Sequence, residues 1–389
     1  MNYINPKDVI LKDYDLLIVG SGLFGLTIAR RAAQELNLHV LIIEKRNHPG
    51  GNAWSSLDVA TGIEVHKYGS HLFHTSNKKV WEFANQISPF RGYRHTVYAK
   101  IKEEVYELPI NLTTINQFFG KNFAPTEASN FLREMAYSES KPLNFEDKVM
   151  SVVGFELYEA FYKGYTIKQW GTDPKLLPAE MASRLPIRTT RNNRYFNDKY
   201  EGLPSNGYFE FLSNIATDPR IQILLNTDYF EIKGNLNPDL LTVYTGPVDR
   251  YFNYSHGKLG WRTLDFQTEL LDVMDYQGAA VMNYPEVEIP FTRIHEYKHL
   301  APEKQDLSSK TIISKEFSRF AESEDEPYYP INTELDRKIY EIYRDETRKE
   351  TNIVFGGRLG TYKYLDMDMA IASAFVAFEN KIRPRFSNE

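Results

Sequence analysis

Cysteine is absent from this chain of 389 residues. Its absence excludes disulfide bonds, cysteine-ligated iron–sulfur clusters and thiolate zinc sites. It also excludes the redox-active cysteine pair on which disulfide reductases depend. A chain without thiols fits a reducing compartment.

An excess of positive charge is also absent. The chain has 46 lysines and arginines against 52 aspartates and glutamates, which gives a formal net charge of -6. Because proteins that bind nucleic acids usually carry a basic surface, we expect no nucleic-acid partner. Any site for an anion must then be built from a few arginines at defined positions.

Long apolar runs are missing as well, and none approaches the roughly 20 residues that cross a bilayer. Residues 1–19 place acidic residues ahead of a short apolar run and lack a small-residue cleavage pattern, so they do not read as a signal peptide. We therefore expect no membrane span and a cytoplasmic location.

The N-terminal part of the chain predicts a β–α–β unit. Asp15–Gly20 and His39–Glu44 have the continuous apolar character of buried strands, and Leu23–Leu36 has apolar residues at helical spacing. Two such strands joined by a helix pair in parallel through a right-handed crossover.

Beyond this unit, the patterns predict a mixture of helices and strands. A hairpin is expected over Arg94–Pro109, turning at Lys102-Glu103-Glu104, and a helical block from Leu112 to about Ser183, with helices over Thr126–Tyr137 and Phe145–Lys163. Later strands are expected at Ile221–Leu225, Leu241–Tyr244 and Asn352–Phe355, with an antiparallel sheet from Ala279–Asn283, Glu286–Ile294 and Thr311–Phe317. The final helices are expected at Asp336–Thr347 and Asp368–Asn380.

The turn between the first strand and helix carries a dinucleotide fingerprint. Gly20, Gly22 and Gly25 have the G-x-G-x-x-G spacing directly after a strand and at the start of a helix. Such glycines make the turn, admit a pyrophosphate to the backbone and let helix and strand pack closely. Glu44 ends the second strand, where a carboxylate accepts hydrogen bonds from ribose hydroxyls. The alternative is a tight turn without a ligand.

FAD is favoured over NAD by two further segments. Gly50-Gly51-Asn52 makes a second backbone-rich loop, which resembles that of FAD-binding proteins of the glutathione-reductase and amine-oxidase type. Gly356–Ala370 (GGRLGTYKYLDMDMA) resembles the late segment with which those proteins return to the flavin. The helix from Asp368 would direct its positive end at the ring and favour reduced, anionic flavin by about 0.3–2 kcal/mol. Asp366 or Asp368 also suits an ordinary helix N-cap.

A second strand, glycine turn and helix that could hold NAD(P)H is not found in the sequence. Electrons therefore arrive from a transient donor of unknown identity, or the reaction consumes none. The fold class expected is α/β, with an FAD-binding Rossmann-like domain, a helical insert domain and an antiparallel β-sheet domain. We assign residues 1–93, 212–250 and 336–389 to the first, 112–185 to the second, and 94–111, 186–211 and 251–335 to the third.

Ten stretches along nearly the whole chain resemble the UDP-galactopyranose mutase family. They are IVGSGLFG, PGGNAW, EVHKYGSHLFHT, GYTIKQWGTDP, ASRLPIR, NRYFND, YTGPVDRYF, IPFTRIHEYKHL, EPYYPI and GGRLGTYKYLDMDMA. The one departure is an N-terminal extension over Met1–Lys12. The resemblance implies interconversion of UDP-galactopyranose and UDP-galactofuranose through a covalent sugar adduct at N5 of reduced FAD, with no net electron transfer. It also implies a homodimer.

The fingerprint and the resemblance together predict two sets of site residues. The cofactor set is Gly20, Gly22, Leu23, Phe24, Gly25, Glu44, Lys45, Arg46, Gly51, Asn52, His71, Gly357, Arg358, Tyr364, Leu365, Asp366 and Met367. The substrate set is Phe161, Tyr165, Thr166, Trp170, Arg184, Tyr195, Arg262, Asn283, Arg293, Tyr329, Tyr364 and Asp366.

Within the substrate set, the resemblance implies particular roles. Arg184, on a mobile loop over Gly171–Arg188, and Arg293 would stabilise the charge of the departing diphosphate, with tyrosine hydroxyls as donors. Phe161 and Tyr165 would hold uracil, although core packing is the other interpretation of Phe161. With His74 and Arg358, the two arginines complete the predicted catalytic set.

His71 and His74 also raise the question of a metal, because two histidines three residues apart can share one ion. Their setting is a loop or strand and no acidic third ligand lies nearby in the sequence, so no metal is predicted. Two other classes stay open: an FAD-dependent oxidoreductase of the amine-oxidase type, and a nucleotide-sugar or flavin-binding regulatory protein without catalysis.

Overall fold

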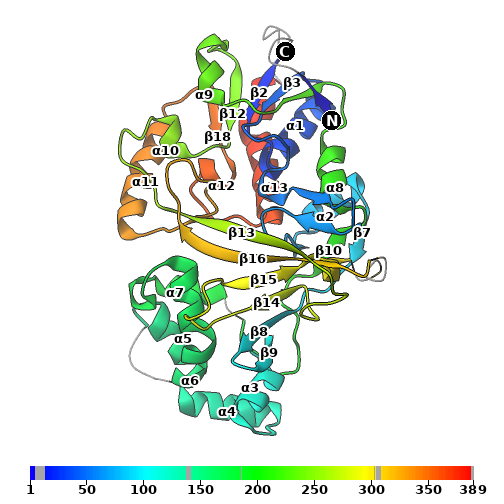
Figure 1. Cartoon of the computed structure of the whole chain (residues 1–389). Coiled ribbons are helices and arrows are strands. Elements are labelled where there is room, and N and C mark those ends of the chain that lie inside the picture. Colours follow the sequence, from blue (N-terminus) through cyan, green and yellow to red (C-terminus); the bar gives the residue numbers. More distant parts are fainter. Residues whose placement is uncertain (5–13, 137–141, 185, 302, 304–307, 387–389) are drawn as a thin grey trace.

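The computed structural model describes residues 1–4, 14–136, 142–184, 186–301, 303 and 308–386, except for the side chains of Ser183 and Arg184. A parallel sheet with its helices forms one end of the molecule, a block of short helices forms the other, and long strands cross between them (Figure 1). The α/β class with a Rossmann-like unit is confirmed.

The first layer is a six-stranded parallel sheet. From edge to edge its strands are β1 (Asn2–Tyr3), β11 (Ile221–Leu224), β3 (Val40–Ile43), β2 (Leu16–Val19), β12 (Leu241–Tyr244) and β18 (Ile353–Phe355). All side chains of β2 and β3 are buried, as expected for strands covered on both faces. The β–α–β unit predicted from the sequence is thus confirmed.

Helices cover one face of this sheet. They are α1 (Leu23–Leu36), α8 (Gly207–Ile215), α13 (Met367–Ala377), the π-helical turn η10 (Phe378–Ile382) and α14 (Arg383–Phe386). Small residues of α1, including Ala29, Ala32 and Ala33, are fully buried, and Ile371 and Ala374 of α13 are buried in the same cluster. This packing sets the first turns of α1 and α13 at the same end of the sheet.

The second layer is a seven-stranded sheet in the middle of the molecule (Figure 1). Its order is β17 (Tyr329–Pro330), β13 (Trp261–Leu271), β16 (Thr311–Phe320), β15 (Arg293–Glu296), β14 (Val281–Asn283), β8 (Val97–Ile101) and β9 (Glu104–Leu108). Every pair is antiparallel except β14 with β8, which is parallel. The hairpin expected at Arg94–Pro109 is confirmed as β8 and β9 and belongs to this sheet.

Two strand predictions for this sheet need correction. The expected strand over Glu286–Ile294 is a loop until Arg293, because Pro290 cannot donate to a ladder and four carbonyls of residues 284–291 bond to Lys168 instead of to a neighbouring strand. The longest strand, β13, is missing from the prediction. It is held by β16 from Arg262, opposite Phe320, to Leu271, opposite Thr311.

Two small sheets join the layers. One has the order β6 (Phe73–Thr75), β10 (Tyr200–Pro204) and β7 (Phe90–Gly92), and the other pairs β4 (Ser55–Leu57) with β5 (Glu64–His66). Residues 186–211, which the sequence groups with the large antiparallel sheet, contribute β10, whose hydrogen bonds go to β6 and β7 instead. Strand β6 thereby brings the His74 region toward the middle of the molecule.

The helical block contains six segments. They are α3 (Leu112–Phe119), α4 (Pro125–Met135), α5 (Phe145–Val153), α6 (Phe155–Leu157), the π-helical turn η4 (Tyr158–Lys163) and α7 (Gly164–Trp170). The expected continuous helix over Phe145–Lys163 is interrupted at Gly154, which has φ +81°, a conformation that side chains disfavour. The expected helix end at Tyr137 lies outside the described residues.

The remaining helices connect these layers. They are η3 (Gly51–Ala53), α2 (Lys78–Ile87), η5 (Pro174–Leu176), η6 (Ala179–Arg184), α9 (Tyr229–Ile232), η7 (Lys233–Asn235), α10 (Val248–Tyr251), η8 (Tyr297–Leu300), α11 (Glu334–Thr347) and α12 (Gly357–Gly360). Among the described residues, no helix combines the length and the apolar character required to cross a membrane.

The contact of α1 with the sheet yields a test of the fold. A Cβ at Gly25 would lie 2.2 Å from the carbonyl oxygen of Gly20, whereas a Cβ at Gly22 would meet nothing within 4 Å. We expect Gly25→Ala to lower the free energy of unfolding of the flavin-free protein by about 1–3 kcal/mol, and Gly22→Ala to leave it nearly unchanged. Urea unfolding followed by tryptophan fluorescence measures both, and equal stabilities would contradict this account.

Candidate active site

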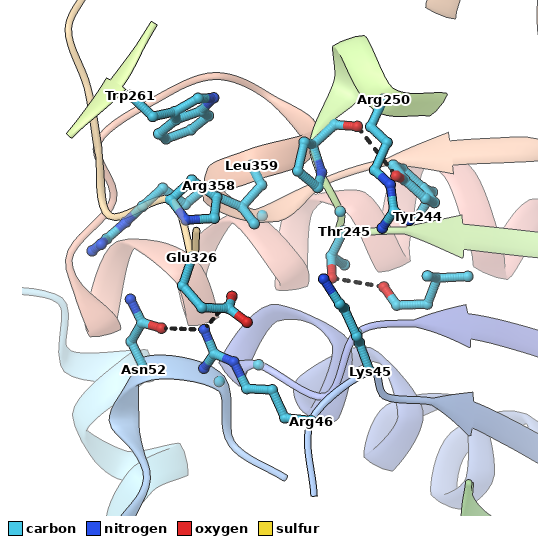
Figure 2. A pocket seen from close by; sticks show the side chains of 18 of the residues that line it. Lys45, Arg46, Asn52, Tyr244, Thr245, Arg250, Trp261, Glu326, Arg358 and Leu359 are labelled. Carbon is cyan, nitrogen blue, oxygen red and sulfur yellow. Dashed lines mark hydrogen bonds and ion pairs between the residues drawn. The ribbon is translucent and has the colours of Figure 1, made fainter. Parts of the chain in front are cut away.

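A cavity of about 1190 Å³ opens at the carboxyl ends of the parallel strands (Figure 2). Val19, Ile43 and Tyr244, the last residues of β2, β3 and β12, line it together with the segments that follow them. This edge is where open α/β sheets bind their ligands. The volume is large enough for an extended ligand of dinucleotide size.

Backbone N–H groups face this cavity at the start of α1. Gly22 is the N-cap and no side chain caps the helix, so the first N–H groups keep their capacity to donate. Gly20 has φ +98°, and a Cβ there would lie 2.1 Å from Thr245 Oγ1, so the turn requires glycine. Such an uncapped helix start is suited to a pyrophosphate.

Glu44 lies at the end of β3 and lines the same cavity. Its Oε2 accepts hydrogen bonds from the Ser21 amide (2.9 Å) and hydroxyl (2.6 Å), and its Oε1 accepts one from the Arg46 amide (2.9 Å). Each carboxylate oxygen has two lone pairs, so Oε1 retains one for a ligand hydroxyl. Glu44 therefore both fixes the turn and faces the position of a ribose.

Arg46 joins two segments that lie on opposite sides of the cavity. Its Nη2 donates to Asn52 Oδ1 and to Glu326 Oε2, both at 2.8 Å, as Figure 2 shows. Its guanidinium carbon also lies 4.5 Å from the centre of the Tyr68 ring. Burial lowers the pKa of Arg46, but Glu326 more than offsets this and the pKa is raised, so the guanidinium stays charged.

Two buried donors of the cavity lining have no hydrogen-bond partner among the described residues: Arg46 Nη1 and Trp261 Nε1. A buried donor without a partner costs free energy, which a bound ligand with acceptor atoms would recover. The phosphates, ribityl chain and ring oxygens of a flavin dinucleotide supply such acceptors. These donors, the free helix start and the spare lone pair of Glu44 together fit FAD.

The other end of the cavity is formed by His71, Arg358 and the first turn of α13. The N-cap of α13 is Asp366, without a side-chain cap bond, so the positive end of this helix faces the cavity. Burial lowers the pKa of His71 to about 3, so its imidazole is neutral at physiological pH. His71 Nδ1 lies 2.6 Å from the carbonyl of Gly69 and is therefore the protonated nitrogen.

Of the predicted cofactor set, all residues except Tyr364 line this cavity. Tyr364 lies next to it, stacked on Tyr329 with ring centres 5.8 Å apart. The guanidinium of Arg358 lies over both rings, 5.0 Å from Tyr364 and 5.9 Å from Tyr329, and donates to the carbonyls of Tyr328 and Leu365. Arg358 thus connects the cofactor cavity to a second group of polar side chains.

Arg293 is at the centre of this second group. One of its guanidinium nitrogens donates to the hydroxyl of Tyr165, and its Nε lies 3.3 Å from Glu316 Oε1, directly across the β15–β16 ladder. Nε does not point along that contact and has no hydrogen-bond partner among the described residues. The charges of Glu316, Arg293, Arg358 and Asp366 all act on the pKa of Tyr329, so these groups lie close together.

Glu316 holds Arg293 in place and is itself held by His295 and Thr292. Its Oε2 lies 3.0 Å from His295 Nε2, whose Nδ1 lies 2.8 Å from Ser70 Oγ, and Thr292 donates to Oε1. Burial raises the pKa of Glu316, but Arg293 and His295 more than offset this and lower it to about 2. The Glu316 carboxylate therefore keeps its negative charge next to Arg293.

The rest of the predicted substrate set lies on several different elements. Asn283 ends the strand beside Arg293, with a buried Oδ1 that has no partner among the described residues, and Tyr195 lies edge-on to His95. Thr166 and Trp170 are on α7 with Tyr165. Phe161 is buried against Tyr106 and Phe118, which favours its packing role. The side chain of Arg184 lies outside the described part of the chain.

Arg262 occupies a different position from the one expected. Its guanidinium is buried, donates to the carbonyls of Lys168 and Gln169 and to Ser318 Oγ, and lies over the Phe320 ring. Burial lowers its pKa to about 10. Because these partners and the ring surround its charge, Arg262 holds the end of α7 on the sheet, and we do not carry it into the substrate site.

His74 and His71 do not share a metal-type site, because their ring nitrogens bond to different partners. His74 Nδ1 lies 2.7 Å from Asp198 Oδ2, and its ring stacks on Phe196 with centres 3.7 Å apart. Asp198 also accepts from Ser76 Oγ at 2.6 Å.

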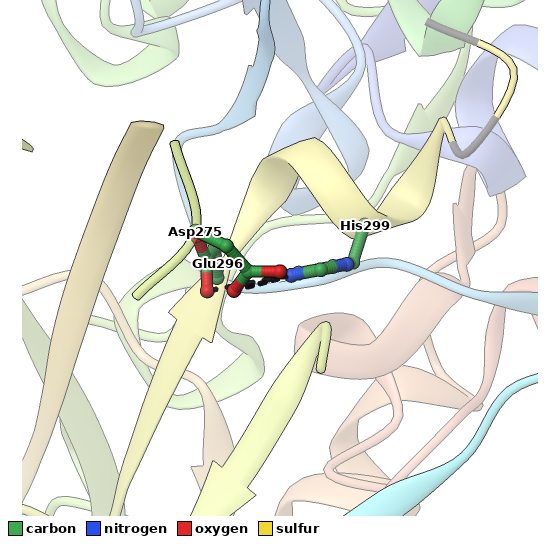
Figure 3. A group of neighbouring side chains, drawn as sticks. All are labelled: Asp275, Glu296 and His299. Carbon is green, nitrogen blue, oxygen red and sulfur yellow. Dashed lines mark hydrogen bonds and ion pairs between the residues drawn. The ribbon is translucent and has the colours of Figure 1, made fainter. Parts of the chain in front are cut away.

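A group of metal-ligand type among the described residues is Asp275, Glu296 and His299 (Figure 3). Glu296 already accepts from the amides of Tyr276 and Gln277 and from Thr311 Oγ1. Burial lowers the pKa of His299, but the two carboxylates more than offset this and raise it, which favours a protonated imidazole. The three side chains are thus bonded to one another and to the surrounding backbone, and these bonds account for the group as part of the fold.

Several residues that shape the site are absent from the sequence prediction: Glu316, His295, Glu326, Asp198 and Lys168. Each is a common charged or polar residue outside a glycine motif, and its role depends on a partner distant in the chain. The pattern of β16 does not single out Glu316, because the first four residues of the strand are all buried and burial does not alternate along it.

The Arg46–Glu326 pair yields a test of flavin retention. Glu326→Gln leaves Arg46 without its counter-charge and weakens the contact across the cavity, so we expect flavin to dissociate about tenfold faster. The measurement is the release of flavin fluorescence after dilution. Glu341→Gln, at an exposed position of α11 outside the cavity lining, is the control, and equal release rates for all three proteins would contradict this role of the ion pair.

Comparisons with known proteins agree with this geometry. Residues 160–364 match the family model for UDP-galactopyranose mutase, and residues 18–87 match an NAD(P)-binding Rossmann-like domain. The chain is similar to a probable UDP-galactopyranose mutase of Klebsiella pneumoniae (42% identity, 94% of each chain). It is also similar to a dTDP-fucopyranose mutase of Escherichia coli (39% identity, 92% of this chain and 96% of that one).

Solved structures agree at the level of the fold. A crystal structure of reduced UDP-galactopyranose mutase superposes with a TM-score of 0.71 at 16% identity, over 96% of this chain and 98% of the other. A putative protoporphyrinogen oxidase from Exiguobacterium reaches a TM-score of 0.62 at 12% identity, over 94% and 97%. On the family model and the sequence relatives, the chain belongs to the UDP-galactopyranose mutase family, a family of FAD-dependent isomerases.

Proposed function

We propose that this chain interconverts UDP-galactopyranose and UDP-galactofuranose with FAD in its reduced form. The observation that carries the proposal is the junction at Arg358, where a cavity fitted for FAD meets a cluster of one buried cation and several phenols. A flavin ring and a sugar diphosphate placed on the two sides of this junction would meet at the anomeric carbon. The relatives named as mutases support the same reaction.

Bound and reduced, the flavin supplies an electron-rich nitrogen that serves as nucleophile toward the anomeric carbon of the sugar. The chain must then stabilise the departing nucleoside diphosphate, whose negative charge grows as the glycosidic bond breaks. Arg293 suits this task. Burial lowers its pKa, but Glu316 and the neighbouring phenols raise it well above its ordinary value, so its charge is present at every physiological pH.

The phenols of Tyr329 and Tyr364 complete the diphosphate site in this proposal. Burial raises the pKa of both hydroxyls, so they remain protonated and donate hydrogen bonds. Tyr165 has a raised pKa for the same reason and holds Arg293 through its oxygen. Neutral donors beside a fixed cation provide hydrogen bonds as well as charge to the two phosphates.

His71 and His74 have different roles in the proposal. His71 is neutral and its Nδ1 proton is committed to Gly69, so Nε2 is left as an acceptor toward the flavin end of the cavity. His74 is oriented by Asp198 and lies near the start of α13, where Thr75 donates to Asp368 at 2.7 Å. We assign His71 to accepting a hydrogen bond at the ring and His74 to the sugar side.

The division of the chain into domains is part of this proposal. Residues 1–93, 212–250 and 336–389 would bind FAD, and 94–111, 186–211 and 251–335 would carry Arg293 and the phenols. Residues 112–185 would supply α7 and a mobile loop that brings Arg184 to the diphosphate and excludes water. We also propose a homodimer in the cytoplasm, supported by the family resemblance and the cysteine-free composition.

The substrate could also be dTDP-fucopyranose, and the observation that favours this second candidate is the 39% identity to the Escherichia coli enzyme of that name. Both substrates need the same diphosphate site and the same anomeric chemistry, so the shared geometry does not distinguish them. Oxidation of an amine would instead require net electron transfer to an acceptor. The folds of the oxidases are similar to this one, but only at 11–12% identity.

The deciding experiment incubates dithionite-reduced, FAD-loaded protein separately with UDP-galactofuranose and with dTDP-fucopyranose and analyses the products by chromatography. We expect conversion of the first to UDP-galactopyranose, without stoichiometric consumption of reductant, and no turnover by the oxidised protein. Conversion of only the dTDP sugar would favour the second candidate. Turnover in air without reductant, or no isomerisation of either substrate, would overturn the proposal.

Arg293→Ala tests the diphosphate role. We expect kcat/KM to fall at least ~100-fold, because the variant lacks the fixed charge beside the leaving group. Arg319→Ala is the matched control: Arg319 lies on the adjacent strand β16 and pairs with Asp265 and Asp325 at the surface. A kcat/KM near the wild-type value in Arg293→Ala, with flavin bound, would reject the assignment.

A further inference from the structure

We propose that Lys168 is a positioning residue, which sets the separation between Tyr165 on α7 and the two residues that flank the loop over 284–292, Asn283 and Arg293. The inference rests on the proposed function, because it concerns the same substrate site. Lys168 lines no part of the flavin cavity, so its effect on the site passes through the loop.

The ammonium of Lys168 is surrounded by backbone carbonyls of this loop. Its Nζ lies 2.5 Å from the oxygen of Tyr284, 2.8 Å from that of Glu286, and 2.9 Å from those of Ile289 and Phe291. An ammonium has three N–H donors, so at least one is shared between two carbonyls. One side chain thereby binds four carbonyls of a loop whose own backbone hydrogen bonds run from the Tyr284 amide to the Thr292 carbonyl and from the Ile289 amide to the Glu286 carbonyl.

The loop is also in direct backbone contact with the start of α7. A Cβ at Gly164 would lie 2.2 Å from the Pro285 oxygen and 3.0 Å from Val287. Only glycine permits this approach, and one helical turn later Lys168 bonds to the same loop. The loop and helix therefore form one unit with two attachment points.

The loop ends are the predicted substrate residues. Asn283 is the last residue of β14 and Arg293 the first of β15. Asn283 Oδ1 is a buried polar atom without a hydrogen-bond partner among the described residues, which is the state expected of a group that awaits a ligand. Arg293 also bonds to Tyr165, which lies on α7 between Gly164 and Lys168. A change in the loop would thus move three substrate groups at once.

The other end of α7 is held independently. Arg262 from β13 donates to the carbonyls of Lys168 and Gln169, and Ser318 of β16 donates to Gln169. With this end fixed on the sheet, the remaining freedom is that of the loop relative to the helix, which Lys168 restricts. Removal of the ammonium should therefore disturb the substrate groups and leave the helix and the flavin cavity in place.

Charged groups that face Lys168 come from two elements. Glu286 and Glu288 of the loop raise its pKa, and Arg262 of β13 bonds to its carbonyl. Burial is the larger effect, and it lowers the pKa to about 8. The ammonium is therefore charged at neutral pH and loses its proton in mildly alkaline solution, where it has one donor fewer and turns a lone pair toward the carbonyl oxygens.

The test is the affinity of the FAD-loaded protein for UDP, measured by calorimetry from pH 6.5 to 9. We expect Lys168→Met to weaken UDP binding at least about tenfold at pH 7, the loss expected for a charge-assisted hydrogen-bonding group, with flavin content unchanged. Lys168→Gln keeps two N–H donors and should bind with intermediate affinity. Lys163→Met is the matched control, since Lys163 is half exposed and bonds to Glu159 one turn earlier on the same helical segment.

The pH dependence of UDP affinity distinguishes a positioning role of the Lys168 ammonium from a general loss of stability in the variant. Wild-type affinity should fall as the pH rises through about 8, and this decline should be smaller in Lys168→Met, although uracil itself loses a proton in alkali in both cases. Equal affinities for wild type and Lys168→Met, or parallel pH profiles, would overturn the inference. If Lys168→Met does not fold, the UDP affinity and the pH profile of Lys168→Gln are compared with those of the wild type in the same way. Failure of the wild type to bind UDP would instead refute the proposed function.

Discussion

A buried carboxylate at the centre of the seven-stranded sheet governs the chemistry available to this molecule. Glu316 carries a permanent negative charge because Arg293, His295 and Thr292 surround it, and in return it keeps Arg293 charged in a place where burial alone would oppose the charge. Breaking such a pair leaves one charge buried without compensation, so each partner fixes the other. The rest of the site is arranged around this fixed point: phenols on one side, the flavin cavity on the other.

The flavin-binding part of the chain could be predicted from the sequence because its signals are local. Gly20, Gly22 and Gly25 act through the turn that they themselves form, and Glu44 follows directly from the end of a recognisable strand. Gly357 and the start of α13 are likewise contiguous. Where a ligand is held mainly by the backbone and by residues a few positions apart, recognising the sequence motif is nearly enough to locate the binding site.

The substrate side could be predicted only in part, since its geometry depends on strand register. Arg293 and Tyr165 were accessible through resemblance, but Glu316 enters the site because it lies opposite Arg293 in a ladder whose strands are separated by a long connection. Strand β13 was missed for a related reason, because seven of its eleven residues are not buried and the strand is held by its pairing with β16. Arg262 differs from the expectation in its partners, since its guanidinium bonds to backbone carbonyls at the end of α7.

Adjacent residues at the start of β13 face opposite sides of the sheet, as successive residues of a strand must. Trp261 turns its indole toward the flavin cavity, and Arg262 turns its guanidinium toward the end of α7. Two consecutive residues therefore connect the flavin cavity with the helix on the substrate side. If cofactor binding displaces this strand end, the helix that bears Tyr165 is displaced with it, and the affinity for the nucleotide sugar changes by some factor. Thermodynamic reciprocity then requires that binding of the nucleotide sugar change the affinity for the flavin by the same factor.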